Sequence, residues 1–234
     1  MRSSTTLKRL FSARERGFFV LLDPDRPLDL ESLFSEINPR EDVKAILVGT
    51  SFLANDDFRG FVRRVKALSQ KPVIIFPGGW TQLAPEADGI LLLSLISGRN
   101  PEFLIGEHVR AAPHIRAMGL EAWPTAYILV ESGRITAVEY VSNTKPIPRG
   151  KVDILAAHVM AAELLGFKAV YLEAGSGALE PVPPEMVKAA RRATDLPLIV
   201  GGGIRSREQA AEAFEAGADF VVVGTAVEQT GKML

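Results

Sequence analysis

The sequence contains no cysteine among its 234 residues, which excludes disulfides, thiolate nucleophiles and cysteine metal sites. It also has little net charge, because 27 lysine and arginine residues face 28 aspartate and glutamate residues. No broad basic surface is indicated, so we expect no nucleic-acid partner. No uncharged apolar run reaches the roughly 18 residues of a membrane span. The polar, basic residues 1–16 lack the apolar core of a secretory signal, and we expect a cytoplasmic protein.

Histidine is scarce as well. The three histidines, His108, His114 and His158, all fall in segments with helical spacing. We interpret them as surface or packing residues, which argues against histidine acid–base chemistry and against a Ser-His-Asp triad.

Short apolar runs alternate with helical patterns along the whole chain. The runs predict strands at residues 17–22, 43–48, 72–76, 89–93, 126–130, 168–172, 198–200 and 220–223. Strands that alternate with helices, without a shift in composition, predict one α/β domain over residues 1–234 with a parallel sheet. Eight such units in a chain of this length fit a single (β/α)8 TIM-type barrel. Residues 1–16 precede it as an N-terminal helix or extension.

The alternation breaks after the third predicted strand. Only about ten residues, Pro85 among them, separate Gly78 from the next run, and a barrel helix needs more. We therefore predict a modified barrel in which the third helix is replaced by a loop or a single turn. The remaining helices are predicted at residues 30–37, 56–68, 101–118, 152–165, 185–193 and 206–216, with a kink or break at Pro113 and an extended excursion at residues 136–141.

Two glycine turns end the last two predicted strands. Gly201-Gly202-Gly203 follows residues 198–200, and Gly224-Thr225 follows residues 220–223. Glycines there let backbone N–H groups approach a ligand closely, and barrels often hold a phosphate after strands seven and eight. The alternative is a pair of tight turns without a ligand, and the tandem arrangement favours the phosphate.

Asp23 ends the first predicted strand. A carboxylate at a barrel mouth needs a partner, and no basic residue is obvious at the other strand ends. Magnesium prefers one or two protein oxygens and completes its shell with water and substrate phosphate. Ser51, after the second predicted strand, can supply a second oxygen. The alternative is that Asp23 only caps the turn before Pro24.

Tyr171 and Glu173 are two residues apart on the sixth predicted strand, so they share a face. A glutamate at a strand end in a nearly neutral mouth is a candidate general base. The alternative is a structural ion pair with Lys151 or Arg205. Ser176, in the following turn, can donate a hydrogen bond to a ligand oxygen.

Five motifs, in this order and spacing, resemble the geranylgeranylglyceryl phosphate synthases, a family of prenyltransferases. They are Leu22-Asp23-Pro24-Asp25, Val48-Gly49-Thr50-Ser51, Tyr171-Leu172-Glu173-Ala174-Gly175-Ser176-Gly177, Gly201-Gly202-Gly203-Ile204-Arg205-Ser206 and the run from Gly217 to Thr225. The glycine motifs occur in many phosphate-binding barrels, so the pairing of Asp-Pro-Asp with Tyr-Leu-Glu-Ala-Gly-Ser-Gly carries the resemblance. That form is similar to the family branch, here called group II-like, of some archaea and Bacteroidetes-type bacteria.

The resemblance implies a barrel without its third helix and a reaction that joins the 3-hydroxyl of sn-glycerol 1-phosphate to C1 of a polyprenyl diphosphate. It implies that Asp23 and Ser51 place Mg²⁺ on the diphosphate and that Glu173 accepts the hydroxyl proton. The glycerol phosphate would be held by Tyr171, Leu172, Glu173, Ala174, Gly175, Ser176, Gly177, Gly202, Gly203, Gly224 and Thr225. A homo-oligomer, either dimer or hexamer, is also implied, and a lipid substrate would be met at a membrane surface. Many members have lysine where this chain has Arg26.

A prenyl tail needs a long apolar groove. Phe52, Phe76, Trp80 and Tyr127 lie near strand ends, but we interpret each as a core-packing residue and count none as a site residue. Two other functions stay open. One is a phosphosugar isomerase or lyase with a similar phosphate cup, and the other is a non-catalytic phospholigand-binding barrel.

Overall fold

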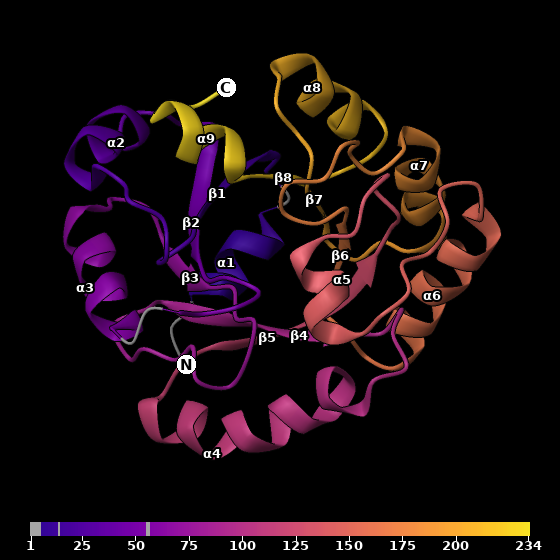
Figure 1. The fold of residues 1–234 in the computed structure, drawn as a ribbon, viewed down its shortest axis with the longest axis horizontal. Helices are drawn as coiled ribbons and strands as arrows, with labels where there is room; N and C mark the ends of the chain where they lie inside the picture. Colours follow the sequence, from indigo (N-terminus) through magenta and orange to yellow (C-terminus); the bar gives the residue numbers. More distant parts are fainter. Residues whose placement is uncertain (1–5, 14, 55–56) are drawn as a thin grey trace.

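The computed structural model describes residues 6–13, 15–54 and 57–234. Eight parallel strands are hydrogen-bonded in chain order, and the eighth pairs with the first to close a barrel (Figure 1). The strands are β1 Gly17–Leu22, β2 Val43–Val48, β3 Val73–Ile75, β4 Gly89–Leu95, β5 Ala122–Leu129, β6 Ala169–Glu173, β7 Leu198–Gly201 and β8 Phe220–Val223. The predicted (β/α)8 barrel is confirmed.

Helices surround the barrel. They are α1 Thr6–Ser12, α2 Leu30–Ile37, α3 Phe58–Leu68, the π-helix η1 Glu102–Gly106, α4 Glu107–Met118, α5 Ala137–Ser142, α6 Val152–Leu164, α7 Pro184–Ala193, α8 Arg207–Glu215 and α9 Thr225–Thr230. In the described part of the chain, no helix is long and apolar enough to cross a membrane. α2 and α8 have side-chain N-caps, because the side chains of Asp29 and Ser206 accept hydrogen bonds from the backbone N–H groups of Ser32 and Gln209.

The connection between β3 and β4 contains turns but no helix, as predicted. It is held against α4 by two contacts. The backbone N–H of Trp80 donates to the carboxylate of Glu107 at 2.5 Å, and the indole ring stacks on His114 with centroids 5.8 Å apart. The missing helix therefore leaves a short loop that covers this side of the barrel.

The extended excursion predicted at residues 136–141 is wrong, because these residues form most of α5. The helix spans only six residues and ends at Asn143 in the left-handed conformation (φ 50°). A segment shorter than two turns contains too few residues for a helical period to be visible in the sequence.

Pro113 does not divide its helix, so the predicted break is absent. α4 continues from Glu107 to Met118 through Pro113, and the irregular turn comes earlier, in η1. Pro113 and Val109, whose carbonyl loses its hydrogen bond to the missing N–H, both lie on the exposed side of the helix. Water can solvate the freed carbonyl there, which makes the proline tolerable.

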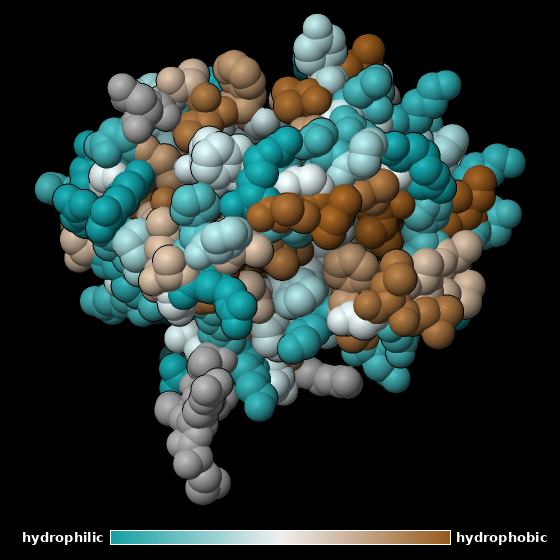
Figure 2. Space-filling model, turned by 90° about the horizontal axis from the view of Figure 1, so that it is seen from below, coloured by the Kyte–Doolittle hydropathy of each residue, from teal (hydrophilic) through white to brown (hydrophobic). Residues whose placement is uncertain are grey.

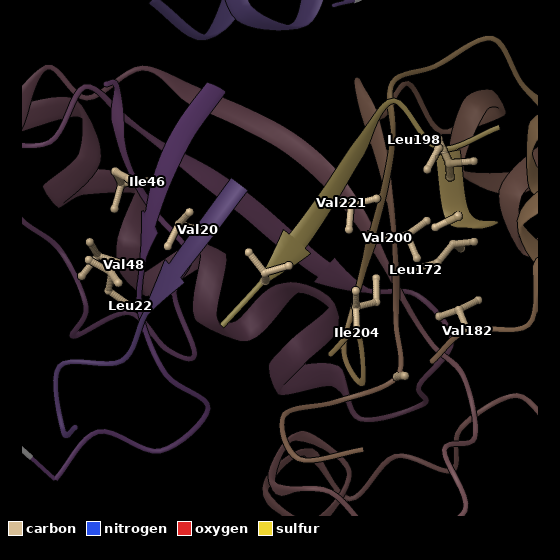
Figure 3. Packing of buried hydrophobic residues seen from close by; sticks show 14 of the residues in the cluster. Val20, Leu22, Ile46, Val48, Leu172, Val182, Leu198, Val200, Ile204 and Val221 are labelled. Carbon is tan, nitrogen blue, oxygen red and sulfur yellow. The ribbon is translucent and has the colours of Figure 1, made fainter. Parts of the chain in front are cut away.

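The strand side chains divide into two layers because they alternate between the two faces of the sheet. Val20, Val48 and Val200 point outward and pack under the helices, as Figure 3 shows. Phe19 and Phe220 point into the barrel, where their rings stack with centroids 4.4 Å apart.

The N-terminal helix α1 closes one end of the barrel. Leu7 and Phe11 are buried with the inward-facing layer, and the Phe11 ring packs edge-on against Phe19 and Phe220. The carboxylate of Glu121 accepts a hydrogen bond from the backbone N–H of Leu7 at 2.8 Å. Side chains fill this end of the barrel. A cavity can therefore open only at the other end, where the strands have their carboxyl ends.

Candidate active site

A cavity of about 810 Å³ opens at the carboxyl ends of the strands. Polar or charged residues from six strand ends line it, together with glycines from four. The predicted site residues on its wall are Asp23, Ser51, Tyr171, Glu173, Ser176, Gly177, Gly202, Gly203, Gly224 and Thr225. Segments that are two hundred residues apart in the sequence thus share one opening.

Asp23 both caps its turn and faces the cavity. One carboxylate oxygen accepts from the backbone N–H of Asp25 at 2.9 Å, and the other accepts from the hydroxyl of Thr50 at 3.0 Å. These two bonds orient the carboxylate, and each oxygen keeps a further lone pair for a ligand. The two alternatives for Asp23 are therefore compatible.

Glu173 is nearly buried, with 5% of its surface exposed, yet it lines the cavity. Its carboxylate accepts a hydrogen bond from the backbone N–H of Gly175 at 2.6 Å. It has no ion pair within the described residues: the Arg205 guanidinium donates instead to the carbonyls of Ala178 and Leu179. The ion-pair alternative is not supported.

Two buried tyrosines, Tyr127 of β5 and Tyr171 of β6, lie beside Glu173. Burial raises the pKa of Glu173, and hydrogen bonds from the Gly175 amide and the Tyr127 hydroxyl lower it in part. The buried Tyr171 hydroxyl has no hydrogen-bond partner among the described residues. Burial and the Glu173 charge both raise the pKa of each tyrosine, so the phenols stay protonated as donors. A carboxylate with a raised pKa that still faces the opening is suited to accept a proton.

The glycine turns expose backbone at the cavity wall. Gly202 and Gly203 have φ of 83° and 73°, a conformation that favours glycine. A Cβ on Gly202 would lie 2.3 Å from the Glu173 carboxylate, so the turn passes directly over the candidate base. At the second turn, α9 begins at Thr225 without a side-chain cap, and its first N–H groups remain available to an anion.

A second, largely apolar cavity lies beside the first, between the β3–β4 connection and η1–α4. Its wall includes Leu92, Leu93, Phe103 and Ala111. The two cavities share the wall residues Thr50, Ser51, Phe76, Tyr127 and Val138. A polar chamber and an apolar chamber therefore meet next to Asp23 and Glu173.

Three of the predicted substrate-binding residues do not line the polar cavity. Leu172 packs outward, beside Val200 of the neighbouring strand and Val182 (Figure 3). Ala174 is buried in the same outer layer. Gly175 takes part only through its backbone N–H, which holds Glu173. Strand alternation explains the difference, because neighbours of an inward-facing residue point outward.

The core-packing interpretation holds for Tyr127, which is buried in the inward-facing layer, but it is wrong for Phe52 and Trp80, which are 68% and 39% exposed. Phe76, Trp80 and Tyr127 line the apolar cavity, and Phe52 lines the polar cavity. The rings of Phe76 and Tyr171 stack with centroids 5.2 Å apart, so this cluster extends to the residue beside the candidate base. An aromatic residue at a strand end has the same sequence signal in a core and in a cavity wall.

The cationic wall of the polar cavity was not predicted from the sequence. Arg26, Arg134 and Arg205 all line it. Arg26 and Arg134 form no ion pair within the described residues. Loop arginines carry no periodic signal, and only the fold brings these two to one opening.

A second missed residue is Glu228 of α9. Its carboxylate accepts from the backbone N–H of Asp23 at 3.3 Å and also lines the cavity. Burial and the negative charge of Asp23 raise the pKa of Glu228. It supports the strand end that carries Asp23.

The donor set suits a magnesium ion. Asp23 supplies carboxylate oxygens and Ser51 a hydroxyl, both hard ligands on the wall of one cavity. Among the described residues, no group of three or more His, Asp or Glu side chains is arranged to enclose a metal. A site with one or two protein ligands, completed by water and substrate oxygens, is the kind that Mg²⁺ commonly occupies.

Comparison with known proteins adds independent information. The sequence profile of the PcrB family matches residues 11–234. The geranylgeranylglyceryl phosphate synthase of Spirosoma linguale is 45% identical over 231 residues, which cover 98% of this chain and 93% of that protein. The synthase of Thermococcus gammatolerans is 45% identical over 222 residues, covering 94% of this chain and 87% of that one.

Solved structures agree with these relatives. The crystal structure of (S)-3-O-geranylgeranylglyceryl phosphate synthase from Thermoplasma acidophilum, in complex with its substrate sn-glycerol-1-phosphate, superposes with a TM-score of 0.88 at 32% identity. It covers 97% of this chain and 93% of that one. The N-acetylmannosamine-6-phosphate 2-epimerase of Clostridium perfringens, with a TM-score of 0.57 at 16% identity, shares the fold alone.

Proposed function

The chain belongs to the PcrB family and, within it, to the geranylgeranylglyceryl phosphate synthases, and from this membership we propose the reaction it catalyses. It is a prenyltransferase. The proposed reaction transfers a polyprenyl group, geranylgeranyl in the family name, from its diphosphate to the 3-hydroxyl of sn-glycerol 1-phosphate. The products are an ether-linked prenylglyceryl phosphate and diphosphate.

The observation that carries this proposal is the junction of the two cavities. The polar cavity has the glycine turns, Asp23 and Glu173, whereas its neighbour has aliphatic and aromatic walls. A substrate with a charged head and a long apolar tail needs this combination, and a phosphosugar isomerase has no use for the apolar chamber. The prenyl C1 carbon would lie at this junction, beside Ser51 and Tyr127, which line both cavities.

Binding of the acceptor follows from the backbone geometry. The amides of the Gly202–Gly203 turn and of the first turn of α9 would hold the phosphate of glycerol phosphate. Ser176 would donate a hydrogen bond to the same ligand. The phosphate is thereby anchored on the side where Gly202 passes over Glu173. The 3-hydroxyl of glycerol phosphate can then reach the carboxylate of Glu173.

The proposed chemistry moves one proton and exchanges one bond. Glu173 accepts the proton of the 3-hydroxyl as the oxygen bonds to C1, and the bond between C1 and the diphosphate oxygen breaks with its electron pair on the diphosphate. Asp23 and Ser51 would hold a Mg²⁺ ion, which supplies Lewis-acid stabilisation to a leaving diphosphate. Arg26 and Arg134 place further positive charge on the same cavity wall. The Tyr127 and Phe76 rings exclude water from the junction and offer π-faces to a developing allylic cation.

The direct test is product formation. The chain is incubated with Mg²⁺, labelled geranylgeranyl diphosphate and either sn-glycerol 1-phosphate or its 3-phosphate enantiomer. We expect an ether-linked lipid and diphosphate from the first enantiomer alone. Absence of product, or equal use of both enantiomers, would contradict the proposal. Repeating the assay with prenyl diphosphates of increasing length defines the donor.

A further inference from the structure

Exposed apolar side chains surround the openings of both cavities. They come from the connections that follow β2, β3, β5 and β6, all at the carboxyl ends of the strands. We call this set the mouth rim: Phe52, Trp80, Ile135, Tyr140, Val141 and Leu179. Phe52 and Ile135 line the polar cavity, and Trp80 and Val141 line the apolar one. The rim is therefore continuous with the cavity walls.

Neighbouring loops hold the rim together. The backbone N–H of Leu179 donates to the carbonyl of Ser132 at 3.2 Å, which joins the loop after β6 to the loop after β5. The side chain of Asn100 donates to the carbonyl of Ser142 at 2.8 Å, which ties the end of α5 to the turn before η1. The rim side chains are thus presented by braced backbone.

Unpaired cations accompany the rim. Arg134 and Lys145 are exposed in the connection after β5, Arg26 is exposed in the connection after β1, and the three form no ion pair within the described residues. By contrast, the acidic Glu180 is paired with Arg149 at 2.9 Å. Aromatic and aliphatic side chains flanked by free cations match the interface of a bilayer with anionic head groups.

We propose that the mouth rim docks on the surface of an anionic lipid bilayer, with the two cavity openings facing the head groups. This inference rests on the proposed function, because a prenyl diphosphate and its lipid product both partition into membranes. A docked mouth would admit the prenyl tail without exposing it to water. Lys145, which lines neither cavity, would contact lipid phosphates, and the apolar rim would enter the interfacial layer.

Exposed apolar surface is not confined to the rim. Figure 2 shows the side of the molecule covered by α4, where hydrophobic surface forms a band across the teal background. Ile105 and Val109 are exposed on η1 and α4, and Leu164 and Leu165 at the far end of α6 are 89% and 72% exposed. The test must therefore distinguish the rim from other apolar patches.

The test compares two matched double variants of the full chain. Tyr140→Ser with Leu179→Ser removes two rim side chains that are 81% and 54% exposed and line neither cavity. Leu164→Ser with Leu165→Ser removes a comparable area at the opposite end of the barrel. Each protein is sedimented with vesicles of phosphatidylcholine alone and of phosphatidylcholine mixed with phosphatidylglycerol.

We expect the wild-type chain and the α6 variant to bind the mixed vesicles, and added salt to weaken the binding. The rim variant should bind about tenfold more weakly, since two interfacial anchors are lost. Equal loss in both variants, or no binding by the wild type, would overturn the proposal. A rim variant that changes the oligomeric state in light scattering would assign the rim to a second copy of the chain and would overturn it too.

Activity measurements separate this inference from the proposed function. The rim variant should use water-soluble geranyl diphosphate as well as the wild type does, but should lose activity on geranylgeranyl diphosphate embedded in mixed vesicles. Vesicle binding needs no catalysis. The docking proposal can therefore be tested even if no ether product forms. Equal activity of the rim variant and the wild type on embedded substrate would contradict the proposed role.

Discussion

The two sides of the barrel mouth have walls of different construction. On the side of β6 to β8, backbone at Gly202, Gly203 and Gly224 forms the wall, with Glu173 as the main side chain. On the side of β3 to β5, side chains such as Leu93 and Phe103 form the wall, and few polar atoms are exposed. Backbone amides recognise an anion whatever its remaining shape, whereas packed side chains select by length and volume. The phosphate half should therefore be sensitive to single atoms and the apolar half to volume.

The largest effect is expected at the carboxylate that joins the two sides. Glu173→Gln keeps the shape but cannot accept a proton, so turnover should fall by about 100- to 10,000-fold. Binding of glycerol phosphate, measured by calorimetry, should change far less, because the glycine amides remain in place. If Glu173→Gln retained most of the wild-type turnover, Glu173 would not be the general base.

Asp23→Asn tests the proposed Mg²⁺ site on the opposite wall. We expect activity to fall by about 100-fold or more, and the residual rate to lose its dependence on added Mg²⁺. Thr50→Val is the matched control, because it removes the hydroxyl that orients Asp23 at 3.0 Å but leaves the carboxylate. It should weaken Mg²⁺ dependence only in part. An unchanged Mg²⁺ titration for Asp23→Asn would place the metal elsewhere.

A pair of glycine variants tests the backbone wall. In Gly202→Ala the new Cβ would meet the Glu173 carboxylate at 2.3 Å, at a φ of 83° that alanine rarely adopts. We expect a loss of about 1–3 kcal/mol in the free energy of unfolding and a raised KM for glycerol phosphate. In Gly224→Ala the nearest atom is 3.4 Å away, so thermal unfolding should change less. Equal melting temperatures in the two variants would show that the close approach at Gly202 is unimportant.

The smallest effect concerns the pH dependence set by Tyr127. Burial raises the pKa of Glu173 and the hydrogen bond from Tyr127 lowers it in part, so Tyr127→Phe should raise it further. The rate should then fall at a higher pH on the acidic side of the profile, while the rate on the plateau changes by only about threefold to tenfold. If the acidic limb of the pH–rate profile of Tyr127→Phe lay at the same pH as in the wild type, Tyr127 would have no influence on the pKa of Glu173.

The same pKa shift has a consequence for stability. The pKa of Glu173 is higher in the folded chain than in the unfolded one, so Glu173 contributes stability below its unfolded pKa, and this contribution is lost as pH rises through the folded pKa. Thermal unfolding of Glu173→Gln should therefore show a gain over the wild type that is larger at neutral pH than in acid.

Much of the polar half could be predicted from the sequence. Gly202 and Gly203 were recognisable because few other residues accept their backbone angles, and Asp23 because an unpaired carboxylate at a strand end requires a partner. The apolar half could not be recognised in the same way. Phe76 and Tyr127 occupy positions where a core residue and a groove residue look alike, and Arg134 lies in a loop without periodicity.

The sequence by itself determined the barrel, its missing third helix and the place of Glu173 at the end of a strand, because each depends on local patterns of spacing and residue type. Only the tertiary structure decided that Arg134 joins the polar wall, that Leu172 faces away from it and that two cavities share Ser51 and Tyr127. These facts depend on the closure of β8 onto β1, which sets the side of the sheet that each residue faces and brings distant strand ends together.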